Sequence, residues 1–362
     1  MLKQLRQFTV RMIAGANVAT LVIMLLVGYS DRLNPEDFAT LSNMGLLFPI
    51  FLLINFAFLI FWLLFKVRYA LIPFVGFLLC YGPVRTYIPF HVSRDVPEGA
   101  IKILSYNTWA FAQGNCDEDG INPIIKYIQQ QDADIVCLQE VGYGGDIANQ
   151  IDSLLYPMYA YRDTTRHPDG GDVVGILSKY PILSKERIRY KSVGNLSVGY
   201  QLQIGKEKVL LVNNHLETTG LTLEERAQFK QLLKGKLETD TAEQASKTLV
   251  TKLAESTRKR ASQAEAVARY VRQHRGMSTI LCGDFNDGPI SYAHRTIAQG
   301  LTDCYVESGN GPGISYHHAG FYVRIDNIMC SDDWTPYNCQ IDRKISSSDH
   351  YPILCYLKKR QK

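Results

Sequence analysis

The chain has 362 residues, of which 46% are hydrophobic and 20% are charged, so its composition is that of a folded protein and excludes a disordered one. Its net charge of +4 is too small to indicate nucleic-acid binding by itself. The eight cysteines form no Cys-x-x-Cys pair and lack the dense spacing of a disulfide scaffold, which leaves the redox compartment open.

Three long apolar stretches lie in the first ninety residues, at 12–29, 45–65 and 71–89. The first two carry no charge and are long enough to cross a hydrocarbon core of ~30 Å at ~1.5 Å per residue. A cleaved signal peptide does not explain a second, more apolar stretch only fifteen residues later. We therefore predict a membrane region at residues 1–90 with two to three transmembrane helices and a lipid bilayer as its partner.

The third apolar stretch decides the topology. Pro and Gly residues interrupt it, and only about sixteen residues before Arg85 are uncharged. Basic residues precede the first stretch and follow the second, which places the amino terminus in the cytoplasm. If the third stretch spans, the rest of the chain lies outside the cytoplasm; if it does not, the rest is cytoplasmic. We favour three spans, and hence a multi-pass cell-membrane protein with an extracytoplasmic domain.

Residues 91–99 are polar and contain Pro and Gly, as is usual in a linker. In the domain that follows, at 100–362, apolar strand-like runs end in polar side chains. These runs are 101–106, 134–140, 172–182, 208–216, 279–286, 322–330 and 346–354. Because folds that contain sheets often build their sites at strand ends, the polar residues there are candidate site residues.

The run that ends in Gly283-Asp-Phe-Asn286 shows the chemistry most clearly. Gly283 permits a sharp turn after the apolar residues. Asp284 can accept a proton or bind a cation, and Asn286 can donate a hydrogen bond to an anionic oxygen without titrating. Glu140 ends another apolar run, and burying an unpaired carboxylate is costly, so it lies either at the surface or on a cation.

Residues 222–275 have helical periodicity, and Gly235 with 239–241 is expected to divide them into two helices. The stretch carries a net charge of +5, from twelve basic and seven acidic residues. It is either a solvated helix pair or a basic surface beside an anionic substrate.

Taken in order, the strand-end motifs resemble the endonuclease/exonuclease/phosphatase superfamily, the deoxyribonuclease-I-like hydrolases. The matching runs are L-S-Y-N-T-W, D-I-V-C-L-Q-E, G-I-L-S-K-Y-P-I, V-N-N-H-L, L-C-G-D-F-N-D, R-I-D-N-I-M and S-S-D-H-Y-P. They cover essentially residues 100–358, whereas the membrane stretches and the length of the helical stretch fall outside the family pattern.

The resemblance implies an α+β fold, a four-layer α/β/β/α sandwich of two mixed β-sheets, here preceded by transmembrane α-helices. It also implies a divalent metal, usually Mg²⁺, with Mn²⁺ as a substitute. The candidate ligands are oxygen donors, which suit a hard cation, and the sequence has no Cys or His set with zinc spacing.

Roles for individual residues follow from the resemblance. It makes Glu140 the principal metal ligand and places Asn107 and Asp349 at the same metal site. Asp284 deprotonates the attacking water and Asn286 holds a non-bridging oxygen. The remaining catalytic residues donate to the phosphoryl group or position a donor: His215, and His350 held by Asp326.

The resemblance leaves the substrate open. We expect in-line water attack on a phosphodiester and favour a nuclease-type enzyme; the alternative is a phospholipid or sphingomyelin phosphodiesterase or phosphatase. A second class is a catalytically inactive, membrane-anchored binding module. Tyr316, Arg260 and Trp109 are candidate substrate-binding residues, which stack on bases, contact lipid or bind an anion. The sequence identifies no protein partner.

Overall fold

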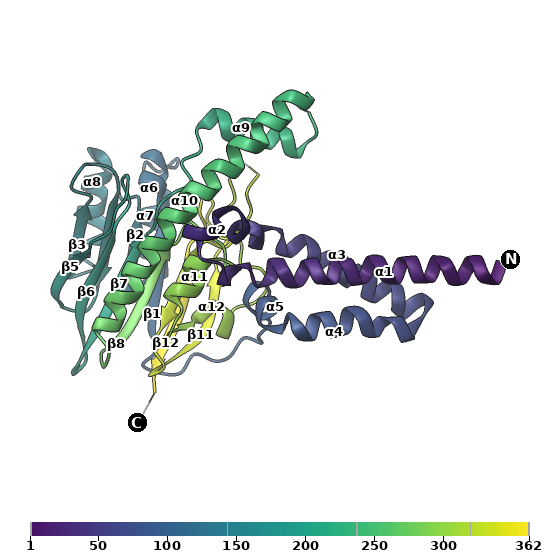
Figure 1. Cartoon of the computed structure of the whole chain (residues 1–362). Coiled ribbons are helices and arrows are strands. Elements are labelled where there is room, and N and C mark those ends of the chain that lie inside the picture. The colour runs from purple at the N-terminus through teal and green to yellow at the C-terminus, as the bar shows by residue number, and fades with distance from the viewer. Residues whose placement is uncertain (1, 143, 237, 319, 361–362) are drawn as a thin grey trace.

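The computed structural model describes residues 2–142, 144–236, 238–318 and 320–360. Two β-sheets pack face to face, helices cover their outer faces, and a group of apolar helices projects from one side (Figure 1). This is the expected four-layer α+β sandwich of two mixed sheets, preceded by helices apolar enough for a membrane.

Each sheet contains six of the described strands and one parallel pair. The first has the order β11 (Trp334–Ile341), β12 (Ile353–Lys359), β1 (Ile101–Asn107), β2 (Ile135–Gln139), β4 (Val173–Ser178) and β3 (Tyr161–Arg166). The second has the order β5 (Ile182–Ile188), β6 (Ser197–Ile204), β7 (Glu207–His215), β8 (Ser278–Asp284), β10 (Asp326–Cys330) and β9 (Thr302–Asp303). β1 runs parallel to β2 and β7 parallel to β8, so both pairs end at the same edge of their sheets.

Apolar residues fill both faces of the central strands, which explains why these strands are continuous apolar runs in the sequence. In β1, Ile103 faces the core between the sheets and Leu104 faces the outer helices. The helices over the first sheet are α7 (Pro123–Gln131), α8 (Asp146–Gln150) and the π-helix η4 (Ile151–Leu155); α6 (Trp109–Gln113) is a short turn beside them. The second sheet is covered by α10 (Thr239–Gln273) and α11 (Tyr292–Ile297), with α12 (Cys304–Ser308) near its edge.

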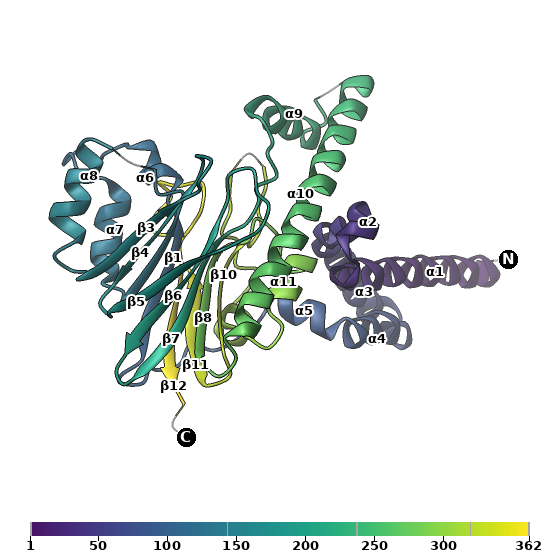
Figure 2. The ribbon, with the colours of Figure 1, turned by 60° about the vertical axis from the view of Figure 1, so that its left-hand side comes forward.

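Residues 222–275 form two helices, as expected, namely α9 (Leu223–Leu233) and α10. The chain turns between them at Gly235, which has a positive φ of 62°. The carboxyl-terminal half of α10 packs on the second sheet through Ala264, Val267 and Tyr270, whereas α9 and the start of α10 project beyond the sandwich (Figure 2).

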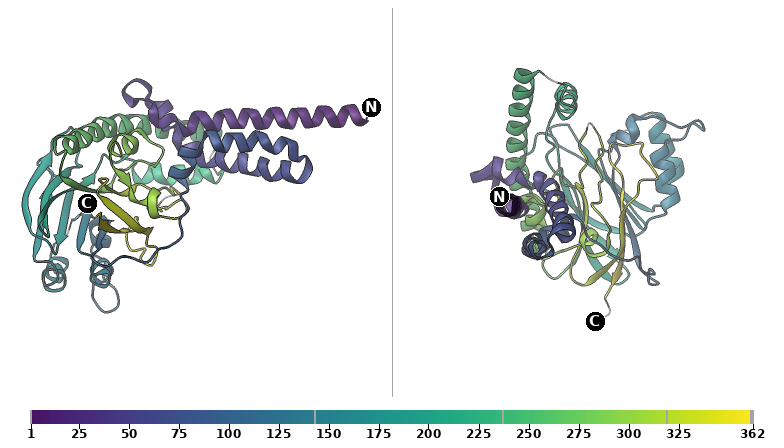
Figure 3. Two further views of the ribbon diagram at one scale, coloured as in Figure 1. Left: turned by 90° about the horizontal axis from the view of Figure 1, so that it is seen from below. Right: turned by 90° about the vertical axis from the view of Figure 1, so that its right-hand side faces the viewer.

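The amino-terminal region contains α1 (Leu2–Gly28), η1 (Ser30–Arg32), α2 (Pro35–Ser42), η2 (Asn43–Leu47), α3 (Phe48–Phe65), η3 (Val67–Ala70), α4 (Leu71–Leu79) and α5 (Tyr81–Tyr87). Two stretches are long and apolar enough to cross a membrane, Lys3–Arg32 and Pro35–Phe65. The third apolar stretch is two helical segments bent by 71°, Val67–Leu79 and Tyr81–Tyr87, and brings the number of spans to three if the pair counts as one. α1, α3 and α4 lie side by side and point away from the sandwich (Figure 3).

Polar side chains join the first two long helices. Asn17 donates to Asn55 over 3.1 Å, and the Trp62 ring donates to Asn17 over 3.0 Å. Such hydrogen bonds hold apolar helices together where no hydrophobic effect drives their association.

The amino-terminal region also packs directly against the sandwich. Thr257 of α10 donates to Asn43 of η2 over 2.8 Å, and the buried Arg324 donates to the Thr86 carbonyl over 2.5 Å. Residues 91–99 contain no helix or strand, but Arg94 N–H donates to Asn338 over 3.0 Å. The expected linker therefore lies along the surface of the sandwich. The amino-terminal region and the sandwich are joined by direct contacts as well as by this linker.

Candidate active site

Strand register places three side chains in one row at the edge of the second sheet. Asp284, at the end of β8, pairs with His215 of β7 on one side and with Asp326 of β10 on the other. Gly283 precedes it with φ +127°, and a Cβ there would lie 2.0 Å from the Asn214 carbonyl oxygen. Only glycine fits this approach of the two parallel strands, which is the physical reason for the Gly-Asp sequence.

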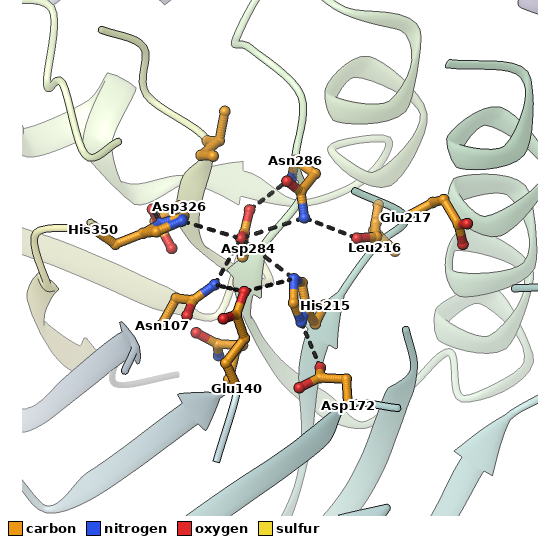
Figure 4. A network of polar contacts seen from close by, with 12 residues as sticks. Asn107, Glu140, Asp172, His215, Leu216, Glu217, Asp284, Asn286, Asp326 and His350 are labelled. Atoms are coloured by element: carbon orange, nitrogen blue, oxygen red, sulfur yellow. Dashed lines mark hydrogen bonds and ion pairs between the residues drawn. The ribbon is translucent and has the colours of Figure 1, made fainter. Parts of the chain in front are cut away.

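The first sheet contributes Asn107, at the end of β1, and Glu140, just after β2. The Asn107 amide donates to Glu140 over 3.0 Å and to Asp284 over 3.1 Å, so one side chain connects the two sheets across the site (Figure 4). Ser348 donates to the Asn107 carbonyl over 2.8 Å, which holds the loop that carries Asp349 and His350 against β1.

Two histidine–carboxylate pairs flank Asp284. His350 Nδ1 lies 2.8 Å from Asp326, and His215 Nδ1 lies 2.5 Å from Asp172. The Nε2 atom of each ring lies 3.6 Å from Asp284 Oδ2 (Figure 4). Sequence reasoning missed Asp172, because it precedes strand β4 instead of ending a strand. The only feature of the sequence that marks Asp172 is its position directly after Gly170 and Gly171.

The charges of these groups depend on one another. Burial lowers the pKa of both histidines, but Asp172 beside His215 and Asp326 beside His350 more than offset it and raise each pKa to about 10. Burial raises the pKa of Asp284 to about 6, while the two histidines oppose that rise. At neutral pH the site therefore holds an ionised carboxylate between two imidazolium ions.

Asn286 lies against Asp284 from the other side. Its backbone N–H donates to Asp284 over 2.7 Å, and its side-chain amide donates to the Leu216 carbonyl over 2.9 Å. Asn286 has φ 51° and Glu140 has φ 53°, a left-handed backbone that asparagine tolerates and that is unfavourable for a glutamate. Such strain gathers where a side chain must be aimed at a site.

The oxygen donors fit a divalent cation at Glu140. Its side chain is 36% exposed; Asn107 donates a hydrogen bond to it, and His215 Nε2 lies 3.8 Å from its Oε1. Asp349 lines the same pocket. Asp284, Asp326 and His350 form a second group with ligand atoms within 4.8 Å of one another. That group is buried and its carboxylates already contact the two histidines, whereas Glu140 is open to the pocket, so Glu140, Asn107 and Asp349 suit the cation better.

The candidate substrate-binding residues differ in their surroundings. Tyr316 lines the pocket; its hydroxyl accepts from Arg226 over 3.1 Å, and its ring meets the His350 ring edge-on at 5.0 Å. Arg260 also lines it but is only 2% exposed and donates to Asp287, Thr257 and the Glu217 carbonyl. Trp109 donates its backbone N–H to Asn107, and its ring lies 6.3 Å from that of His318.

Residues 104–350 match the sequence model of the Endonuclease/Exonuclease/phosphatase family. The chain belongs to this family. The chain is thus a metal-dependent phosphoester hydrolase of the nuclease or phosphatase type. A second family model, described as a domain of unknown function, matches residues 10–87. No curated protein matched the chain.

Several solved structures are similar to this chain at low sequence identity. The human Nocturnin catalytic domain with bound sulfate is 17% identical, with a TM-score of 0.51, and the match covers 74% of this chain and 97% of that one. A humanised D. rerio TDP2 is 17% identical, with a TM-score of 0.49 over 72% of this chain and 99% of that one. A family protein from Bacteroides thetaiotaomicron is 15% identical, with a TM-score of 0.47 over 73% of this chain and 96% of that one.

Proposed function

We propose that the chain is a membrane-anchored phosphodiester hydrolase that uses Mg²⁺, with Mn²⁺ as a substitute. The observation that carries this proposal is the environment of Asp284, a buried carboxylate with an imidazole nitrogen 3.6 Å away on each side and with Asn107 linking it to Glu140. A base, two cationic donors and a metal-binding carboxylate are the groups that attack of water on a phosphate ester requires.

Each residue then has a step in the reaction. Asp284 accepts a proton from the attacking water, whose oxygen forms the new bond to phosphorus, and Asn286 donates to a non-bridging oxygen. His215 and His350 donate hydrogen bonds to the phosphoryl oxygens as negative charge builds on them. The bond from phosphorus to the leaving oxygen breaks, and that oxygen takes a proton from one of the two imidazolium groups.

A divalent cation would be held by Glu140, Asn107 and Asp349, where it supplies positive charge to the phosphate. Asp172 and Asp326 act through their histidines: each fixes the ring orientation and keeps the ring protonated. They are positioning residues.

Metal titration of the full-length protein tests the proposal. With bis-p-nitrophenyl phosphate as substrate, we expect hydrolysis that EDTA abolishes and Mg²⁺ restores. Glu140→Gln should raise the half-saturating Mg²⁺ concentration by about 10- to 100-fold, since it removes the principal ligand charge. The matched control is Glu118→Gln, at an exposed position. No cleavage of any phosphoester by the wild type would leave the inactive binding module as the better account.

We also propose that the catalytic domain lies outside the cytoplasm, in a cell-membrane protein with three spans. The side-by-side arrangement of α1, α3 and α4 supports it, because the amino terminus and η3 then share the end of the bundle remote from the sandwich (Figure 1). A reporter fused after residue 362 that is active only outside the cytoplasm should give a signal. A signal from a cytoplasm-only reporter would contradict three spans.

A further inference from the structure

An apolar groove lies beside the catalytic pocket. It has a volume of about 440 Å³ and is lined mostly by hydrophobic side chains. We define it by six of these residues, Leu46, Leu47, Leu249, Val250, Phe321 and Tyr322. They come from η2, from the projecting part of α10 and from the loop before β10, and Phe229 of α9 stacks on Phe321 at 4.3 Å.

The groove is continuous with the catalytic pocket. Leu46, Leu253 and Phe321 line both, and so does the turn at Asp287 and Gly288, directly after Asn286. A molecule whose phosphate lies beside Asp284 therefore has a hydrophobic path leading away from the reacting atoms.

The groove also adjoins the membrane region. Leu46 and Leu47 immediately precede α3, which belongs to the more apolar of the two membrane-spanning stretches. Several of the groove side chains face solvent in the isolated chain: Val250 is 46% exposed and Tyr322 is 64% exposed. Exposed apolar surface of this kind marks a site that binds something apolar.

The charges that line the pocket and the groove do not suit a long nucleic acid. Among the described residues that line the pocket and the groove, the lysines and arginines are Arg226 and Arg260, and Arg260 is committed to Asp287. Binding a nucleic-acid strand requires many contacts between cations and phosphates along its backbone. A lipid ester has one phosphate region and an apolar chain, which matches a polar pocket that continues into an apolar groove.

We infer that the substrate is a membrane lipid phosphodiester, with its phosphate at Asp284 and a hydrocarbon chain in the apolar groove. This inference rests on the proposed function and selects the lipid alternative over the nuclease type that the sequence favoured. The membrane helices then have a direct role, because they hold the groove beside the bilayer from which the lipid enters.

A homologous series of substrates tests the inference. The full-length protein in detergent is assayed on methyl, butyl and octyl p-nitrophenyl phosphate, which share one leaving group. Because each fully buried methylene favours binding by about fourfold, kcat/KM should rise by at least about tenfold from the methyl to the octyl ester. A smaller rise would overturn the inference while leaving the hydrolase intact; no cleavage of any ester would instead overturn the proposed function.

Two groove variants identify where the hydrocarbon chain of the substrate binds. Val250→Glu and Tyr322→Glu place a charge in the groove at exposed positions that tolerate it, and each should reduce the octyl-to-methyl ratio of kcat/KM by at least about fivefold. Leu183→Glu, an exposed apolar position on the edge strand β5, is the control and should keep the wild-type ratio. An unchanged ratio in both groove variants, or faster cleavage of a single-stranded oligonucleotide than of the octyl ester, contradicts the inference.

Discussion

Asp284 shows how one residue acquires its chemistry from its neighbours. Burial raises the pKa of its carboxyl group, whereas His350 and His215 lower that pKa because they favour the ionised form. The resulting pKa is about 6. A base with a pKa slightly below neutral is ionised at pH 7 and still takes a proton readily in the transition state.

Replacing this base should affect the chemical step. Asp284→Asn has the same shape but does not accept a proton, and we expect kcat to fall by about 10²- to 10⁴-fold. Asp169→Asn, in an exposed turn, is the control and should behave as wild type. A kcat within about tenfold of wild type for Asp284→Asn, in protein with a native circular-dichroism spectrum, would exclude Asp284 as the base.

Asp172 and His215 should act as a unit. Asp172→Asn removes the charge that keeps His215 protonated, and we expect it to lower kcat by about 10- to 100-fold. In the double variant with His215→Gln, kcat should be no lower than with His215→Gln alone, because the carboxylate acts only through the ring. If the effects of the two substitutions on kcat multiply in the double variant, Asp172 contributes independently of His215.

At this scale the sequence indicated most of the side chains that the structure brings together. His215 and Asp284 end strands of one parallel pair, so their common location follows from that pairing, whereas the contact of Asn107 with Asp284 depends on the packing of the two sheets. Asp172 could not be found in this way. Its contact joins the start of a strand in one sheet to the end of a strand in the other, and the packing of the two sheets is not encoded in either local pattern.

At the scale of elements, the site depends on close contact between β7 and β8. Gly283→Ala should lower the melting temperature by at least about 5 °C, because φ +127° costs a non-glycine residue about 1–3 kcal/mol and the Cβ would contact the Asn214 carbonyl. Gly175→Ala in β4 is the matched control, since its Cβ would meet Val141 at an ordinary 3.4 Å. Equal melting temperatures for the two variants would contradict this account of the turn.

The elements themselves were predictable to different degrees. Central strands such as β2 and β8 are recognisable because both of their faces are buried, which requires continuous apolar runs. The division of the third apolar stretch into α4 and α5 was not predicted. Both segments are apolar and helical, and the bend between them follows from Pro83. Pro83 has no N–H to donate to the Leu79 carbonyl, which accepts from the Tyr29 hydroxyl over 2.6 Å instead.

On the scale of the whole molecule, the apolar amino-terminal helices and the sandwich form one packed unit. The interface includes the apolar cluster of Met24, Val27, Phe48 and Ile290, in which Ile290 belongs to the catalytic domain. The sequence suggested only a linker at 91–99, because an interface between two regions is built from residues scattered along both.

Gly45 tests this docking. A Cβ there would lie 2.1 Å from the Ile290 carbonyl oxygen, so Gly45→Val must separate η2 from the catalytic domain, and we expect the melting temperature in detergent to fall by several degrees. Gly15→Val in α1 is the control, since nothing lies within 4 Å of its added Cβ. If Gly45→Val melts at the same temperature as Gly15→Val, the two regions are not packed as described.

Isotope incorporation tests most directly the claim that this site activates water to attack phosphorus. Octyl p-nitrophenyl phosphate is hydrolysed by the full-length protein with Mg²⁺ in H₂¹⁸O, and the molecular masses of the products are measured by mass spectrometry. We expect one ¹⁸O atom in octyl phosphate and none in p-nitrophenol, with no labelled product from Asp284→Asn on the same timescale. Label in p-nitrophenol, unlabelled octyl phosphate, or equal labelling by Asp284→Asn would contradict the account.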